Sequence, residues 1–237
     1  MNAVNYQKEF ENIVSGFDSK KPTLLLHSCC APCSSYCLVY LRKWFDITCF
    51  YYNPNITDQD EYIKRVAELH KLVEALSTEP IMIGGDEHGN SIIIENASPI
   101  DELGKISVID GMYEPNLFFD EVKSKNLERE IEGGKRCEMC FNMRLSEAAK
   151  IASKGGFDYF TTSLTISPLK NAMLLNTIGE NIASIYAGLK WLPSDFKKRN
   201  GYKLSTILSE RYDLYRQDYC GCIYSQVERM NNRKDVL

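Results

Sequence analysis

The sequence predicts an α/β fold in which helices flank a parallel sheet. Short apolar runs alternate along the chain with longer segments of helical periodicity, and the links between them are short. The first apolar run, residues 23–27, follows Pro22 and is rich in leucine, as is typical of a buried parallel strand. Cys29, Cys30 and Cys33 come directly after it. Because open α/β sheets bind ligands at the carboxyl ends of their strands, we expect a cysteine-rich site at that edge.

Turn and capping residues mark the boundaries of the other elements. Ser34 and Ser35 are expected to cap the helix after the cysteines, and Thr57 or Asp58 to cap the next one. The turn signal Asn53-Pro54-Asn55 closes the second strand. The expected strands are 23–27, 47–52, 80–83, 157–162 and 190–192; the expected helices lie within 1–19 and at 36–44, 59–76, 117–131, 141–153, 171–186 and 204–212; a polar, basic loop is expected at 195–202.

One domain accounts for the length of the chain. The 237 residues suit a single α/β domain, 1–237, with an excursion at about 86–135, where glycines, polar residues and Pro99 interrupt the pattern. The N-terminal residues lack the apolar core of a signal peptide, and no apolar stretch approaches the ~20 residues of a membrane helix. We therefore expect a cytoplasmic protein without a membrane partner. The net charge of −4 gives no global signal for nucleic acid but is compatible with a local basic patch.

The nine cysteines are of two kinds. Cys37 and Cys49 stand alone in apolar surroundings and are interpreted as small buried hydrophobes. Structural disulfides are rare in the cytoplasm, so grouped cysteines there indicate metal or redox chemistry. The grouped cysteines are Cys29, Cys30 and Cys33, then Cys137 and Cys140, then Cys220 and Cys222.

Several short motifs together resemble those of a known family. In chain order they are HSCCAPCS, FYYNPNI, GGKRCEMCFNMRL, FDYFTTSLTISPLKN, DFKKRNGY and YRQDYCGC. Over about residues 24–222 this series resembles the epoxyqueuosine reductases of the QueH type. The resemblance implies a Rossmann-like sheet similar to that of the nucleotide alpha hydrolases, with cysteines in place of the glycine-rich phosphate loop. It also implies an iron–sulfur cluster and an external electron donor. The activity that it implies is the last step of queuosine synthesis: the substrate is tRNA carrying epoxyqueuosine, and the epoxide of that nucleoside is reduced to an alkene.

Four cysteines are expected to hold the cluster that the resemblance implies. Cluster irons commonly take four thiolate ligands, and Cys29, Cys30, Cys137 and Cys140 supply them from two loops that a parallel sheet can bring to one edge. A structural zinc site is the competing interpretation, because four thiolates suit zinc equally well. Cys33 is a candidate ligand for one additional metal ion; the competing interpretation is a cysteine at the start of a helix that binds no metal.

Cys220 and Cys222 are interpreted as a redox-active pair. A disulfide between positions i and i+2 closes a tight ring, and poor disulfide geometry makes the bond easy to reduce. Gly221 between them permits an unusual φ angle. The competing interpretation is that the two sulfurs are further metal ligands.

Substrate contacts are expected in the basic loop. Lys197, Lys198 and Arg199 can contact tRNA phosphates, and Tyr202 can stack on an extruded base. A solvated loop is the competing interpretation. His27 could donate a proton to the opening epoxide, but a satisfied core histidine is favoured because this residue ends a buried strand. The further candidates are Lys135, Arg136 and Lys203 for phosphates, Tyr212, Tyr215 and Tyr219 for stacking, and Asp218 and Tyr219 for proton donation.

Two other functions fit part of the pattern. One is another iron–sulfur enzyme that modifies tRNA, such as a sulfur transferase, although the chain lacks the S-G-G-x-D-S type of loop that binds ATP. The other is a zinc-stapled RNA-binding module without catalysis. The colour and metal content of anaerobically purified protein would separate a cluster from zinc.

Overall fold

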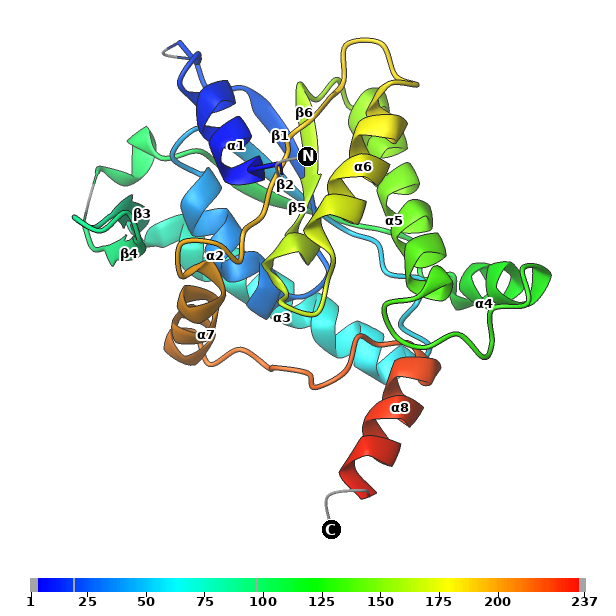
Figure 1. The fold of residues 1–237 in the computed structure, drawn as a ribbon. Coiled ribbons are helices and arrows are strands. Elements are labelled where there is room, and N and C mark those ends of the chain that lie inside the picture. Colours follow the sequence, from blue (N-terminus) through cyan, green and yellow to red (C-terminus); the bar gives the residue numbers. More distant parts are fainter. Residues whose placement is uncertain (1–3, 19, 97, 235–237) are drawn as a thin grey trace.

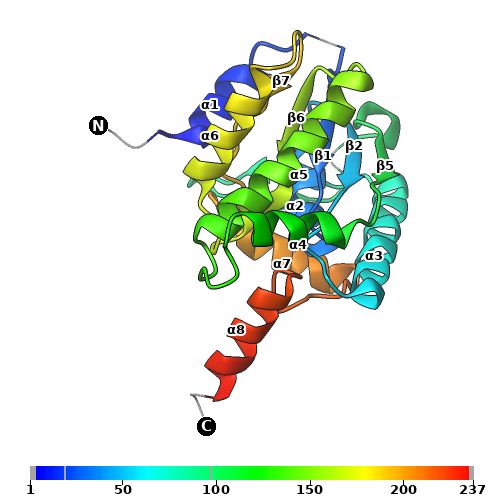
Figure 2. The ribbon, with the colours of Figure 1, turned by 90° about the vertical axis from the view of Figure 1, so that its right-hand side faces the viewer.

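The computed structural model describes residues 4–18, 20–96 and 98–234. Its centre is a five-stranded sheet in the order β5-β2-β1-β6-β7, with every neighbouring pair parallel (Figures 1 and 2). Helices cover both faces of this sheet, which confirms the predicted α/β class. The strands are β1 Thr23–His27, β2 Asp46–Tyr51, β5 Ile106–Asp110, β6 Tyr159–Thr162 and β7 Lys190–Trp191.

The central strand β1 contributes to a core on each face of the sheet. Leu24 and Leu26 share one core with α2 (Ala31–Leu41) and α3 (Gln59–Thr78), while Leu25 shares the other with α5 (Lys135–Lys154) and α6 (Ala172–Ala183). Successive side chains of a strand point to opposite faces, so a run of three leucines serves both cores. The other helices are α1 Tyr6–Val14, α4 Pro115–Ser124, α7 Gly201–Arg211 and α8 Ile223–Lys234, with short 3-10 helices η1 Ile100–Glu102 and η2 Ser163–Ile166.

The helix after the first cysteines begins earlier than predicted. Cys30 is its N-cap residue, and Pro32 lies in its first turn, where proline's fixed φ suits a helix start. The prediction that Ser34 and Ser35 cap the helix is therefore wrong: both lie inside α2, and the Ser35 hydroxyl donates to the Pro32 carbonyl oxygen at 2.9 Å. This shift places Cys33 in the first turn of α2, on the same side of the molecule as the end of β1.

The segment predicted to be the third strand of the sheet lies outside it. β3 (Met82–Gly85) pairs antiparallel with β4 (Ser91–Ile94) in a separate hairpin. The reason is turn chemistry: the Asp86 carboxylate accepts from the backbone N–H groups of His88 and Asn90, and Gly89 has a positive φ of 77°. The edge of the parallel sheet is β5 instead, which lies within the expected excursion and pairs with β2.

The remaining boundaries follow the sequence signals with small shifts. Asp58 caps α3 by accepting from the Glu61 N–H at 2.8 Å. Helix α4 ends at Ser124, short of the predicted 131, and Asn126 just beyond it is left-handed, with a φ of 54°. Of the N-terminal helix expected within 1–19, residues 1–3 and 19 lie outside the described residues. Across the described ranges, no helix combines the length and apolar character needed to cross a bilayer.

Candidate functional site

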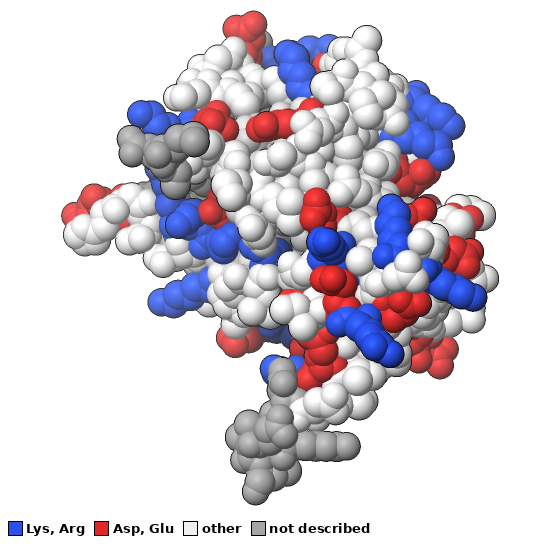
Figure 3. All heavy atoms as spheres, turned by 45° about the vertical axis from the view of Figure 1, so that its right-hand side comes forward, with Lys and Arg blue, Asp and Glu red and all other residues white. Residues whose placement is uncertain are grey.

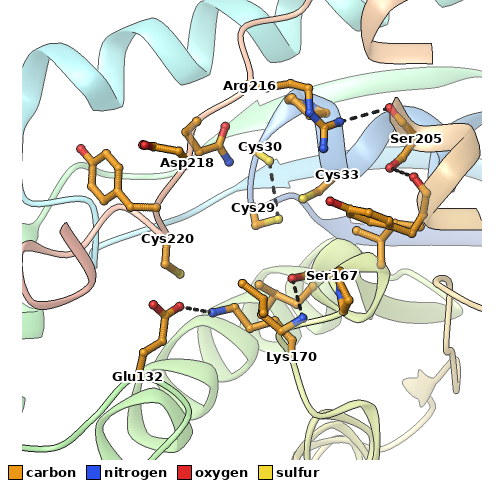
Figure 4. A pocket seen from close by; sticks show the side chains of 18 of the residues that line it. Cys29, Cys30, Cys33, Glu132, Ser167, Lys170, Ser205, Arg216, Asp218 and Cys220 are labelled. Atoms are coloured by element: carbon orange, nitrogen blue, oxygen red, sulfur yellow. Dashed lines mark hydrogen bonds and ion pairs between the residues drawn. The ribbon is translucent and has the colours of Figure 1, made fainter. Parts of the chain in front are cut away.

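A cavity of about 300 Å³ lies at the carboxyl edge of the sheet, where β1 gives way to α2 (Figure 4). Cys29, Cys30 and Cys33 line it from this junction, which confirms the predicted position of a cysteine-rich site. Cys220 reaches the same cavity from the segment before α8. Further lining residues come from the stretch 164–170 after β6, the first turns of α7 and residues 216–219, together with Glu132, Arg144 and Arg229.

The first three cysteines form a tight group. The sulfur atoms of Cys29, Cys30 and Cys33 lie within 4.8 Å of one another, and those of Cys29 and Cys30 are 3.9 Å apart. Ser163 holds Cys29, since its hydroxyl donates to the sulfur at 3.3 Å and accepts from the Cys29 N–H at 3.1 Å. Hydrogen bonds from Cys29 and then Cys33 hold the pKa of Cys30 well below its usual range. Donating to Cys30 raises the pKa of Cys29 to about 11. A thiolate flanked by two thiols is suited to hold a metal ion.

The other four grouped cysteines surround a smaller cavity beside the first. Cys137 and Cys140 face it from α5, and Cys220 and Cys222 face it from the chain before and at the start of α8. Helix α5 begins at Lys135, earlier than the predicted start at residue 141. The C-x-x-C motif, Cys137 to Cys140, therefore lies within its first turns. Burial raises the pKa of Cys140 to about 11 and that of Cys222 to about 12.

Cys220 and Cys222, the C-x-C motif, lie far along the sequence from the expected cluster ligands, but the structure brings the motif beside two of them, Cys137 and Cys140. Cys220 lines both cavities, so it connects the Cys29 group with Cys137 and Cys140. The backbone of Cys220 is anchored, because its carbonyl oxygen accepts from Arg65 at 3.3 Å and its N–H donates to the Ser225 hydroxyl at 3.1 Å. All nine cysteines are free thiols in the structure. The assignment of individual cysteines to a cluster or to a redox pair stays a prediction.

Gly221 confirms the expected backbone requirement of the C-x-C. Its φ is 115°, a conformation that L side chains rarely adopt. A Cβ atom there would lie 2.7 Å from a side-chain carbon of Ile56. Both the backbone angle and the close packing therefore demand glycine between the two cysteines.

His27 is a satisfied core histidine, as favoured from the sequence. Its Nδ1 lies 2.8 Å from the Thr162 hydroxyl and its Nε2 lies 3.1 Å from the Tyr52 carbonyl oxygen. Burial, and then the charge of Arg144, lower the pKa of His27 to about 3, so the ring stays neutral at physiological pH. The ring is not among the residues that line either cavity, which supports the structural interpretation of His27.

Two cations at the site were missed by the sequence analysis. Lys170 lines the larger cavity and its Nζ donates to Glu132 at 3.0 Å (Figure 4). Glu132 also accepts from the Ser225 hydroxyl at 2.9 Å. Arg144 lines the same cavity, and its Nη1 lies 4.0 Å from the Cys140 sulfur. The available signal for Arg144 was its spacing: it follows Cys140 by one helical turn and so shares its face of α5.

The expected substrate residues divide between two places. Tyr202 lines the cavity, together with Tyr219. Lys197 instead binds Asp195 at 2.6 Å and the Thr165 carbonyl oxygen at 3.3 Å. Lys198 and Arg199 line a separate surface groove, where Arg199 pairs with Glu11. Contact of these residues with tRNA stays a prediction.

Some further candidates are wrong. Arg136 is buried and donates to the carbonyl oxygens of Leu127, Glu128 and Glu130, so it is not available to phosphates. Tyr212 is also buried, and its hydroxyl donates to Glu79 at 2.7 Å. On the face drawn in Figure 3, positive and negative side chains are interspersed rather than gathered into a field of one sign.

Comparison with known proteins gives one consistent result. The family model described as epoxyqueuosine reductase QueH matches residues 24–228. Proteins named epoxyqueuosine reductase QueH from Staphylococcus epidermidis and Streptococcus pyogenes are both 38% identical to this chain; the matches cover 98% and 94% of it, and 89% and 78% of those proteins. A protein of the same name from Thermotoga maritima is 32% identical over 90% of this chain and 95% of its own length.

Proposed function

The chain belongs to the epoxyqueuosine reductase QueH family, and from this we propose that it reduces epoxyqueuosine in tRNA to queuosine. The observation that carries the proposal is the pair of adjoining cavities lined by all seven grouped cysteines at the carboxyl edge of the sheet. Removing the epoxide oxygen consumes two electrons and two protons, releases water and leaves an alkene. A site made of thiols is suited to this reduction. Family membership does not favour a sulfur transferase or a zinc-stapled RNA-binding module.

The donor set fits a [4Fe-4S] cluster. Such clusters take thiolate ligands, and Cys29, Cys30, Cys137 and Cys140 are four thiols in the walls of adjoining cavities. When bound there, the cluster would supply one-electron transfer. Cys33 lies within 4.8 Å of the Cys29 and Cys30 sulfurs, which supports its role as a ligand of one additional metal ion.

The pair Cys220 and Cys222 supplies both electrons and both protons for this reduction. Two thiols that become a disulfide release two electrons and two protons, which equals the demand of the epoxide. Cys220 lines both cavities and so lies between the substrate cavity and the C-x-x-C. The disulfide left behind returns to two thiols when an external electron donor delivers two electrons and two protons are taken up. The position of Cys220 supports this role of the pair as the electron and proton donor.

The cavity and its rim suit an extruded nucleoside of tRNA. Tyr202 and Tyr219 offer rings on which a base can stack. Arg216 and Arg229 line the same cavity with exposed side chains that can reach phosphates. The basic loop, with the exposed Lys198, extends this contact along the surface. A tRNA substrate would place the protein in the cytoplasm.

Nucleoside analysis of cellular tRNA tests the proposed function. In cells that lack this protein, we expect epoxyqueuosine to accumulate and queuosine to be absent, because the last reduction is missing. Liquid chromatography with mass spectrometry of digested tRNA measures both nucleosides. Restoring the wild-type gene should return queuosine, which serves as the control. Normal queuosine in deleted cells that have no second reductase would refute the proposed function.

Salt-dependent binding tests the tRNA contacts. Arg216→Ala and Lys198→Ala should each raise KM for tRNA with a smaller change in kcat, because a lost phosphate contact weakens binding rather than chemistry. Each should flatten the slope of log affinity against log salt by about 0.7–0.9. Lys154→Ala is the matched control: Lys154 is exposed at the far end of α5, away from the C-x-x-C. A Lys198 variant with the wild-type slope would exclude the basic loop from the tRNA interface.

A further inference from the structure

The buried cations of the described residues differ in what balances their charge. Burying a charge is costly unless an opposite charge or strong hydrogen bonds compensate it. Arg65 pairs with Glu61, Arg136 with Glu228, and Lys170 with Glu132. Arg42 donates to the carbonyl oxygens of Leu76 and Glu79, at the negative end of the α3 dipole. Each of these four cations therefore has a local source of negative charge.

Arg144 has no such partner among the described residues. Only 2% of this residue is exposed, and the ion pairs of the described residues do not include it. Its Nε lies 3.3 Å from a ring nitrogen of His27, and its Nη2 donates to the Asn53 side-chain oxygen. Both groups are neutral, so they orient the guanidinium without balancing its charge.

The third nitrogen of the guanidinium lies near a sulfur atom. Nη1 of Arg144 lies 4.0 Å from the Cys140 sulfur, and Arg144 lines the cavity that Cys29 and Cys220 also line. Burial lowers the pKa of Arg144, but the Cys140, Cys220 and Cys29 sulfurs, when ionised, outweigh burial and raise that pKa overall. Within the described ranges, no ion pair with a carboxylate balances Arg144, and the negative charges that raise its pKa are those that these sulfurs can carry.

We infer that Arg144 is the counter-charge of the sulfur site, where it stabilises the negative charge that thiolates and their bound cluster carry and so raises the reduction potential of that cluster. The inference rests on the proposed function only in assuming that a cluster is bound. Hydrogen bonds and charges near cluster sulfurs are known determinants of cluster potential. The guanidinium acts through the sulfurs and is a positioning residue, held in place by His27 and Asn53.

Potentiometry of the reconstituted protein tests the charge. Arg144→Gln removes the positive charge and should shift the midpoint potential to a more negative value, because the reduced state carries the extra negative charge. Arg144→Lys keeps the charge and should restore most of the wild-type potential. Arg42→Gln removes a buried cation remote from the sulfurs and should leave the potential unchanged. A wild-type potential in Arg144→Gln, or equal shifts in the Gln and Lys variants, would overturn the inference.

A second measurement uses the metal-free protein and needs neither cluster nor activity. Cys140→Asp places a carboxylate beside the uncompensated guanidinium, whereas Cys140→Asn places a neutral group of the same shape there. We expect the Asp variant to unfold at a higher temperature than the Asn variant, and this gain to vanish when Arg144→Gln is added. Equal unfolding temperatures in the first pair would contradict the counter-charge role. Because no substrate is involved, this result is independent of the nucleoside analysis.

Discussion

Replacing either cysteine of the C-x-C with serine is expected to abolish multiple turnover while leaving the iron content and colour of the protein unchanged. The physical reason is the number of electrons that the reaction needs. Reducing the epoxide takes two electrons and two protons; a cluster passes electrons singly, whereas a dithiol delivers both electrons at once. Serine matches the size of cysteine but cannot form a disulfide. Anaerobic reconstitution followed by iron, sulfide and turnover assays on Cys220→Ser and Cys222→Ser measures the effect.

The geometry makes the contrary outcomes informative. Cys220 and Cys222 share a small cavity with Cys137 and Cys140, so the four sulfurs could also serve one metal site. If either serine variant loses its iron, these sulfurs are ligands and the dithiol role is wrong. If both variants retain iron and full turnover, the C-x-C has no essential part. Cys37→Ser is the matched control, since Cys37 is buried in the body of α2 and its thiol donates to the Cys33 carbonyl oxygen at 3.3 Å.

Loss of bound iron is the second large effect that we expect, in alanine variants of Cys29, Cys30, Cys137 and Cys140. Removing one of the four proposed thiolates leaves an iron without a protein ligand, and the cluster should become labile. Iron and sulfide assays after anaerobic reconstitution, with the absorbance near ~400 nm that is typical of such clusters, measure occupancy. Alanine at Cys37 should keep iron near the wild-type level, because its sulfur fills the core rather than a cavity.

The four positions need not respond equally, and the pattern distinguishes two ligand sets. Full occupancy in Cys137→Ala and Cys140→Ala together would remove the C-x-x-C from the site. The remaining candidates would then be Cys29, Cys30 and Cys33, whose sulfurs lie within 4.8 Å of one another. Loss of iron in the C-x-x-C variants together with the Cys220 variant would instead place the metal in the smaller cavity.

Local patterns in the sequence determined the central strand and the position of the site. The leucine run after Pro22 predicts β1 because an uninterrupted apolar run is what a strand buried on both faces requires. Asp58 predicts the start of α3 because an aspartate side chain can satisfy the free N–H groups of a first helical turn. The cysteines follow β1 directly, so their place at the carboxyl edge follows from chain direction alone. These features depend on residues within a few positions of one another.

Only the tertiary structure decided which distant segments meet. β3 has the composition of a sheet strand, yet the Asp86–Gly89 turn returns the chain onto it and leaves the edge of the parallel sheet to β5. Likewise, the spacing of the cysteines in the sequence does not place Cys220 beside Cys137, and it does not place Arg144 in one cavity with Cys29. Periodicity and capping report each segment's own burial and hydrogen bonding, whereas neighbours across the chain are chosen by the packing of the whole core.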